Sequence, residues 1–142
     1  MTKTFAKSGI RFQYPTNWTM DLDETEGAWT ATFQSPETAF LLVSLRPDAE
    51  TTIQVAEEAL GALKVEYQEL EAETAIDNLA GQPAVGHDID FFTLDTAVVC
   101  WTRCIETPGG PLLVMCQVSE YDRARQEPVL RAVCASLKVD EE

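Results

Sequence analysis

Hydrophobic and polar positions alternate in two early segments of the chain, residues 8–14 and 28–34. Alternation with a period of two places one set of side chains on a buried face and the other in water, so both segments are predicted to be strands. Residues 39–45 are apolar almost throughout, and we expect a third strand there that is covered on both faces. The polar, acidic residues 21–27 are interpreted as a loop.

The strongest strand signal lies between residues 97 and 119. Two runs rich in apolar and β-branched residues flank the sequence Thr-Pro-Gly-Gly-Pro at 107–111, and this pattern predicts a β-hairpin. Neither run alternates cleanly, so both faces of the hairpin are expected to be covered. Residues 70–76 and 84–92 predict further strands, with a loop at 77–83 between them.

Residues 51–67 carry the clearest helical pattern. Thr51 followed by Gln54 forms a capping-box sequence at the amino end. Gly61 lies in the middle, where glycine costs about 1 kcal/mol relative to alanine, and we interpret it as a place of close approach to the sheet. Apolar residues recur at helical spacing on one stripe: Ile53, Ala56, Leu60, Leu63 and Tyr67.

A second helix is predicted near the carboxyl end of the chain. Proline is favoured at the first position of a helix, so Pro128 is placed there, after a polar segment at 120–126 that begins a turn or a short helix. The acidic tail 138–142 is expected to fray. The apolar stripe of this helix consists of Val129, Leu130, Val133 and Leu137.

The order of the elements predicts the fold class. Strands, one helix, more strands and a closing helix, joined by hairpin-type connections, indicate an α+β domain. Its sheet is expected to be mainly antiparallel, with helices packed against it. A chain of 142 residues has the length of a single domain, so we expect one domain over residues 1–142 with a core at about 8–139.

The chain is strongly acidic, with 24 acidic and 10 basic side chains and a net charge of −14. Nucleic-acid binding and docking on an anionic membrane are disfavoured, because both need clustered Lys and Arg. A protein partner with a basic surface is permitted, since the field of the molecule would raise its association rate. Residues 48–77 hold nine acidic side chains and one lysine, which we interpret as a solvated helix surface.

The sequence shows no signal-peptide pattern, and no apolar run approaches the roughly 20 residues of a membrane span. We therefore expect a cytoplasmic protein. Because cysteines remain reduced in the cytosol, the four cysteines are expected to be free, buried thiols: Cys100, Cys104, Cys116 and Cys134.

Three short motifs together resemble the PsbP-like superfamily, which includes the Ran-binding Mog proteins and bacterial DcrB-type domains. They are Phe-Gln-Tyr-Pro at 12–15 followed by Trp18, Gly-Gln-Pro-Ala at 81–84, and Ala-Ser-Leu at 135–137. Their order and spacing match over about residues 8–139. The resemblance implies an α/β/α sandwich, with an antiparallel sheet of about six strands flanked by helices. It also implies a role as an interaction module, since members serve as photosystem subunits, as a partner of a nuclear GTPase and as chaperones of type VI secretion effectors. It implies no catalytic residues.

The spacing of the cysteines indicates no metal site. Cys100 and Cys104 share a strand face but lie about 13 Å apart, too far to share a metal ion or form a disulfide. Cys104 and Cys116 adjoin only if the hairpin turn has a suitable length, which the sequence leaves open. Without a Cys-x-x-Cys pair, zinc is not expected.

His87 is the only histidine in the chain. Strand alternation places Asp88 and Asp90 on one face and His87 on the other, so the three side chains do not converge on a catalytic or metal site. We interpret this segment as an edge strand or a solvent-facing one.

Two kinds of residue are candidates for a partner surface. Arg123, Arg125 and Arg131 form the only basic concentration, which either offsets local charge or contacts the carboxylates of a partner. Tryptophans are more often core residues, but an exposed one would be the best anchor for a partner. The three tryptophans are Trp18, Trp29 and Trp101.

These observations predict a non-enzymatic protein-interaction, adaptor or chaperone-like domain that carries no cofactor. Two alternatives stay open. One is a small-ligand-binding protein with an apolar pocket between helix and sheet. The other is an enzyme whose site is assembled from dispersed residues around His87 or a cysteine. The partner and the oligomeric state are left open.

Overall fold

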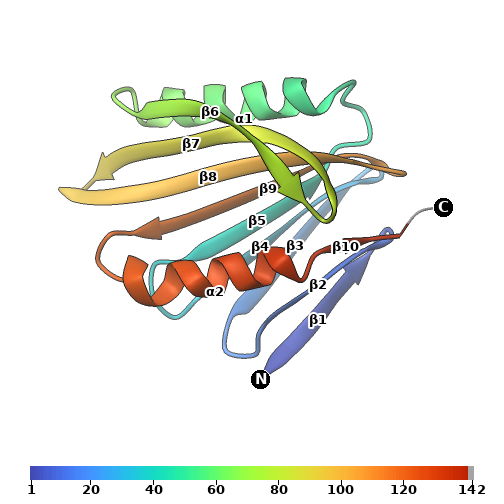
Figure 1. The fold of residues 1–142 in the computed structure, drawn as a ribbon, viewed down its shortest axis with the longest axis horizontal. Helices are drawn as coiled ribbons and strands as arrows, with labels where there is room; N and C mark the ends of the chain where they lie inside the picture. Colours follow the sequence, from blue (N-terminus) through green and yellow to red (C-terminus); the bar gives the residue numbers. More distant parts are fainter. Residues whose placement is uncertain (141–142) are drawn as a thin grey trace.

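The structure is a computed structural model that describes residues 1–140. Within these residues the elements follow in chain order, as Figure 1 shows: β1 (Thr2–Lys7), β2 (Ile10–Pro15), β3 (Thr19–Thr25), β4 (Ala28–Gln34), β5 (Phe40–Leu45), α1 (Thr52–Glu66), β6 (Glu71–Leu79), β7 (Gln82–Thr93), β8 (Thr96–Thr107), β9 (Gly110–Ser119), α2 (Arg123–Ala135) and β10 (Lys138–Val139).

Seven strands form one antiparallel sheet in the order β3-β4-β5-β9-β8-β7-β6 (Figure 1). The predicted hairpin at 97–119 forms its centre as β8 and β9. Thr107 pairs with Gly110 across a two-residue turn. The prediction of an α+β fold with a mainly antiparallel sheet is confirmed, and the main sheet has seven strands instead of about six.

A second, smaller sheet with the order β1-β2-β10 packs against one face of the large sheet. The sequence pattern predicts neither β1 nor β10. The tail that was expected to fray supplies β10, in which Val139 pairs with Ile10, and the Asp140 N–H donates to the Gly9 carbonyl at 2.8 Å. Residues 141–142 of the tail lie outside the described residues.

Four hairpin turns have two residues with positive φ, the type I′ geometry that suits the twist of paired strands. This explains two errors. Residues 21–27 are mostly strand β3 and its turn, and the loop at 77–83 shrinks to a two-residue turn between β6 and β7. In both places a short X-Gly turn holds the strands together. The turns are residues 8–9, 26–27, 80–81 and 94–95, of which only the last has no glycine.

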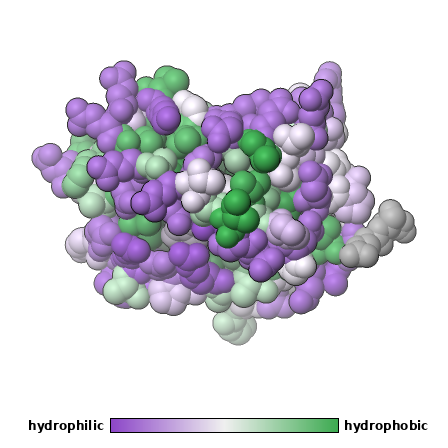
Figure 2. Space-filling view, turned by 45° about the horizontal axis from the view of Figure 1, so that its top comes forward, coloured by the Kyte–Doolittle hydropathy of each residue, from purple (hydrophilic) through white to green (hydrophobic). Residues whose placement is uncertain are grey.

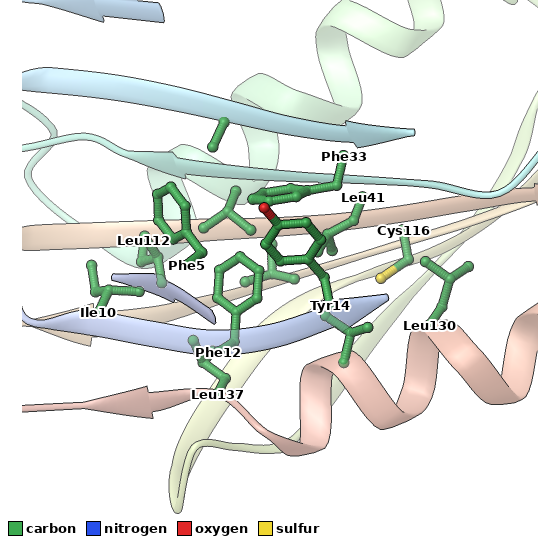
Figure 3. Packing of buried hydrophobic residues seen from close by; sticks show 14 of the residues in the cluster. Phe5, Ile10, Phe12, Tyr14, Phe33, Leu41, Leu112, Cys116, Leu130 and Leu137 are labelled. Atoms are coloured by element: carbon green, nitrogen blue, oxygen red, sulfur yellow. The ribbon is translucent and has the colours of Figure 1, made fainter. Parts of the chain in front are cut away.

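Helix α1 covers one face of the large sheet, whereas α2 and the small sheet cover the other (Figure 1). Aromatic side chains fill the space between the two sheets. Figure 3 shows Phe5, Phe12 and Tyr14 of the small sheet around Phe33 of β4, with ring centroids of contacting pairs 4.7 to 5.5 Å apart. The predicted α/β/α sandwich is present, and the small sheet extends one of its outer layers.

Helix α1 begins as predicted, because the Gln54 N–H donates to Thr51 Oγ1 at 3.0 Å. The Gln54 side chain accepts a hydrogen bond from the backbone one residue before Thr51. The buried stripe is rotated: Ile53 is 62% exposed, and Val55 is fully buried instead. The predicted close approach at Gly61 is also wrong, since within residues 1–140 no atom apart from the neighbouring residues and the backbone of the helix itself lies within 4 Å of where its Cβ would be.

Helix α2 begins at Arg123, so Pro128 lies inside it and not at its first position. The earlier start follows from a buried contact at the N-cap. The Asp122 carboxylate is 1% exposed and accepts hydrogen bonds from the Thr38 N–H at 3.0 Å and from the Thr38 hydroxyl. The predicted stripe is otherwise confirmed, with Val129 only partly buried and the other members in the core: Leu130, Val133 and Leu137.

Candidate functional site

An acidic surface lies on β6 and β7, on the face of the sheet opposite α1. Register places Glu71 directly opposite Asp90 and Glu73 directly opposite Asp88, and all four side chains are exposed. We call this set of four carboxylates the acidic face. Figure 2 turns the side of the molecule with α1 and β6 toward the viewer, and on that side too most of the visible surface is hydrophilic, with hydrophobic residues among the polar ones.

One arginine partly neutralises this surface. The Arg103 side chain is only 11% exposed, and its Nε lies 3.1 Å from both carboxylate oxygens of Asp77. Its Nη2 lies 3.0 Å from an oxygen of Asp88. Within residues 1–140, no salt bridge neutralises Glu71, Glu73 or Asp90, so most of the charge on the acidic face is free to act on its surroundings.

The acidic face continues into a hydrophobic tip at the β7–β8 turn. Phe92 follows Asp88 and Asp90 on the same face by strand alternation and is 73% exposed, while Leu94 in the turn is 95% exposed. Leu94 and Asp95 both have positive φ, 52° and 64°. Residues other than glycine rarely adopt this conformation, and it stores strain. The tip therefore presents two large apolar side chains to solvent on a strained turn.

A cleft of about 240 Å³ lies beside α2, near the turn between β6 and β7. We call it the α2 cleft. The Arg131 guanidinium stacks over the Trp101 ring at 4.2 Å from the centroid, a cation–π contact. Its lining combines charged, aromatic and sulfur-containing side chains, among them Asp77, Trp101, Arg103, Arg131 and Cys134.

Two thiols meet at the inner wall of this cleft. Cys116 of β9 is fully buried and Cys134 of α2 is partly buried, and their sulfur atoms are 3.6 Å apart. Figure 3 shows Cys116 between the large sheet and α2. Burial, together with the bond to Cys134, raises the pKa of the Cys116 thiol well above its ordinary value. The hydrogen bond between the two sulfur atoms and the charges of Arg131 and Arg103 lower the pKa of Cys134.

The other two cysteines lie on the opposite face of the sheet, under α1. As predicted, Cys100 and Cys104 share a face. Cys104 pairs with Leu113 across the hairpin, so it does not adjoin Cys116, and the question that the sequence left open is answered. Burial raises the pKa of each of these thiols to about 12. No local sequence pattern predicts the Cys116–Cys134 contact, because the contact depends on how α2 crosses the sheet.

The interpretation of His87 as part of an edge or solvent-facing segment is wrong. β7 is an inner strand, and His87 is 5% exposed beneath α1. Its Nε2 lies 3.4 Å from an oxygen of Glu57, and its Nδ1 is buried with no hydrogen-bond partner among residues 1–140. The prediction that His87 and the two neighbouring aspartates do not converge is confirmed by their opposite faces.

The tryptophans of the predicted partner surface are core residues. Trp18, Trp29 and Trp101 are each at most 5% exposed, which corrects their placement among possible surface anchors. Burial follows from the register and packing of the strands, which apolar character alone does not determine.

The three arginines of the same prediction pair with carboxylates of their own chain. Arg123 binds Glu120 and Glu127, Arg125 binds Glu37, and Arg131 binds Glu127. These pairs support the first interpretation, in which the arginines offset local charge.

A metal ion and a small ligand are two further possible occupants of a site in the part of the chain that the structure describes. Its His, Cys, Asp and Glu side chains form no group of three that could hold a metal ion. An apolar space between α2 and the sheet, lined by Phe12, Val133 and Leu137 among others, has a volume of only about 10 Å³. A space of this size is at the lower limit for one water molecule, so it does not favour the small-ligand alternative there.

Neither described helix is long and apolar enough to cross a membrane.

No protein-family model matches the sequence, and no curated protein matches it. Solved structures do match. CyanoP, the cyanobacterial PsbP of Synechocystis sp. PCC 6803, aligns with a TM-score of 0.65 and 16% identity, over 98% of this chain and 92% of its own. The chain has the PsbP-like fold. The fold that the three sequence motifs implied is thereby confirmed, whereas the likeness to Mog and DcrB-type proteins stays a prediction.

Two other structures with similar PsbP-like architecture come from bacteria. PA94 from Pseudomonas aeruginosa, a protein of unknown function and suggested regulator, aligns with a TM-score of 0.61 and 17% identity over 99% of both chains. LpqN, involved in cell envelope biogenesis of Mycobacterium tuberculosis, aligns with a TM-score of 0.54 and 14% identity over 98% of this chain and 90% of its own. At these identities the likeness shows the PsbP-like fold alone.

Proposed function

We propose that the chain is a non-enzymatic protein-interaction domain of the cytoplasm, which binds a basic segment of a partner protein through the acidic face. The observation that carries this proposal is the register of β6 and β7. It sets two pairs of carboxylates directly opposite each other, Glu71 with Asp90 and Glu73 with Asp88. The proposal does not rest on the overall acidity of the chain, which favours solubility in any case.

Like charges at directly opposite positions of an antiparallel pair destabilise it, and Arg103 compensates this repulsion only at Asp88. A single change to lysine would replace this repulsion with attraction. A bound cationic segment would have the same effect, because its Lys or Arg side chains would lie between the carboxylates. The repulsion between the carboxylates would lower the stability of the free domain. A bound cationic segment would relieve this repulsion, and the free energy gained would contribute to binding.

The hydrophobic tip completes the surface. Interfaces gain most of their free energy from a few large side chains surrounded by polar contacts, and Phe92 supplies such an anchor at the end of the acidic face. The expected partner segment therefore carries several Lys or Arg residues followed by an apolar residue. The charges would raise its association rate and the apolar contact would slow its dissociation.

Charge reversal on the two edge strands tests the proposal. Glu71→Lys with Glu73→Lys changes the acidic face, and Asp21→Lys with Asp23→Lys is the matched control on β3, the other edge of the same sheet. Both double variants change the net charge by the same amount at exposed positions. The probe is a fluorescent peptide of alternating Lys and Arg that ends in Leu-Trp, measured by anisotropy at low salt.

We expect the β6 variant to raise the Kd about tenfold or more, equivalent to about 1.4 kcal/mol, and the β3 variant to leave it nearly unchanged. Urea unfolding gives a second readout. The β6 variant is expected to be more stable than wild type by about 0.5 kcal/mol, so its loss of binding would not come from unfolding. Equal weakening by both variants would show that only net charge attracts the peptide and would overturn the proposal.

A further inference from the structure

Cys116 and Cys134 lie close enough for a redox reaction between them, and neither belongs to the acidic face proposed to bind a partner. Their sulfur atoms lie 3.6 Å apart, and a disulfide requires about 2.05 Å, so a small shift of α2 relative to β9 would allow a bond. The two residues are separated by 18 positions in the chain. The contact joins an outer helix to the central strand of the large sheet.

The two thiols differ in access. Cys134 lines the α2 cleft, whereas Cys116 is 0% exposed behind it. A small solute that enters the cleft therefore meets Cys134 first. Arg131 and Arg103 line the same cleft, and their guanidinium groups favour a negative charge on Cys134.

We propose that Cys134 is a peroxide-sensitive thiol and that Cys116 resolves its oxidised form as an intramolecular disulfide. The Cys134 thiolate attacks one oxygen of hydrogen peroxide, the O–O bond breaks, and the products are a sulfenic acid on Cys134 and hydroxide. The Cys116 thiol then displaces the sulfenic oxygen, which leaves as water with the thiol proton, and the Cys116–Cys134 bond forms. A cellular dithiol reductant reverses the change by thiol–disulfide exchange.

The electrostatics of the pair agree with these roles. The group that attacks peroxide must be a thiolate, and the hydrogen bond between the two sulfur atoms and the charges of Arg131 and Arg103 lower the pKa of Cys134. The pKa of the buried Cys116 is raised, so in the second step this thiol transfers its proton to the departing sulfenic oxygen as the disulfide forms. Cys100 and Cys104 lie under α1 on the opposite face of the sheet, so neither is in reach of Cys134 and neither is expected to resolve it.

The experiment treats the purified, reduced protein with hydrogen peroxide, blocks the remaining thiols with N-ethylmaleimide and maps disulfide-linked peptides by mass spectrometry. We expect two of the four free thiols to be lost and one linked pair, Cys116 with Cys134, to appear. Addition of a dithiol should restore all four. The melting temperature should rise by several degrees on oxidation, because the bond constrains the unfolded chain.

Three variants separate the roles of the two thiols. Cys116→Ala should accumulate a sulfenic acid on Cys134 that dimedone labels, since the resolving thiol is gone. Cys134→Ser should show neither dimedone labelling nor a disulfide. The matched control, Cys104→Ala, removes a buried thiol from the other face and should form the Cys116–Cys134 bond as wild type does. Retention of all four thiols in wild type, or a disulfide that involves Cys100 or Cys104, would overturn the proposal.

Two arginine variants of α2 test the cleft itself. Arg131→Gln removes the cation next to Cys134, and we expect its oxidation by peroxide to slow several-fold. Arg123→Gln changes the charge of the same helix by the same amount, but Arg123 does not line the cleft, so the rate should stay near that of wild type. Equal rates in the two variants would show that Arg131 does not activate the thiol. These readouts do not depend on peptide binding, so they stand or fall separately from the proposed function.

Discussion

Gly86 of β7 has no room for a side chain, because the backbone of the paired strand β8 lies against it. A Cβ at this position would lie 1.8 Å from the carbonyl oxygen of Thr102 and 2.5 Å from its carbonyl carbon. Both atoms belong to the backbone of a central strand and cannot move aside like the end of a flexible side chain. At the next residue, the His87 backbone N–H donates to the Thr102 hydroxyl at 3.0 Å, so the close contact also fixes the backbone that carries the buried histidine.

Gly86 in β7 and Gly61 in α1 both have ordinary backbone conformations but different surroundings, so replacing each with alanine should have opposite effects on stability. Gly86→Ala should lower the free energy of unfolding by about 3 kcal/mol or more, because overpacking between two paired strands forces the backbone apart. Gly61→Ala in α1 should raise it by about 0.5 to 1 kcal/mol, because the helix gains the propensity of alanine and no atom lies within 4 Å of the new methyl group. Urea unfolding of both variants measures the difference, and a stable Gly86→Ala variant would contradict the close contact.

In helix α2, the Glu127 carboxylate forms ion pairs with two arginines, Arg123 and Arg131. Glu127 lies 2.7 Å from Arg123 and 3.0 Å from Arg131, each four residues away along the helix. The hydrogen bond from Arg123, followed by that from Arg131, lowers the pKa of Glu127 below its ordinary value of 4.5. A carboxyl group whose pKa is lower in the folded state stabilises the fold above its unfolded-state pKa. This contribution is lost as the pH falls through the folded-state pKa.

We therefore expect Glu127→Gln to destabilise the protein at pH 7 by about 0.5 to 1 kcal/mol, since partly exposed i,i+4 ion pairs are each worth a few tenths of a kcal/mol. The difference from wild type should shrink as the pH falls below 4.5 and vanish once Glu127 is protonated in the folded state. Thermal unfolding followed by circular dichroism over this pH range measures it. Glu69→Gln, at an exposed carboxylate without a salt bridge among residues 1–140, is the control and should leave the stability at pH 7 nearly unchanged.

The whole molecule carries a net charge of −14, and its carboxylates cluster on the edge strands as well as on α1. Self-repulsion of this kind destabilises the compact state. Raising the salt from about 0.01 M to about 0.1 M shortens the Debye length from about 30 Å to about 10 Å. We expect the melting temperature to rise by a few degrees with sodium chloride and equally with choline chloride. A fall would show that the described ion pairs outweigh the repulsion.

Several elements could be predicted because their signals are local. The capping residues Thr51 and Gln54, the Pro-Gly-Gly turn of the central hairpin and the alternation in β2 and β4 depend on neighbours within a few positions. The prediction of a loop at residues 21–27 was wrong because the local patterns for a strand and for a loop are equally weak there. β3 is acidic and exposed along its whole length, so its composition resembled a loop, and its type I′ turn at residues 26–27 was the signal that could have identified it.

The sequence by itself determined the fold class, the faces of most strands and the apolar stripe of α2, because periodicity records which side chains must leave water. Only the tertiary structure decided that Cys116 meets Cys134, that His87 is buried, and that four carboxylates lie opposite one another on β6 and β7. These contacts join residues far apart in the chain. They depend on strand register and on the path of a helix across a sheet, which the packing of the whole core fixes and no short window of sequence encodes.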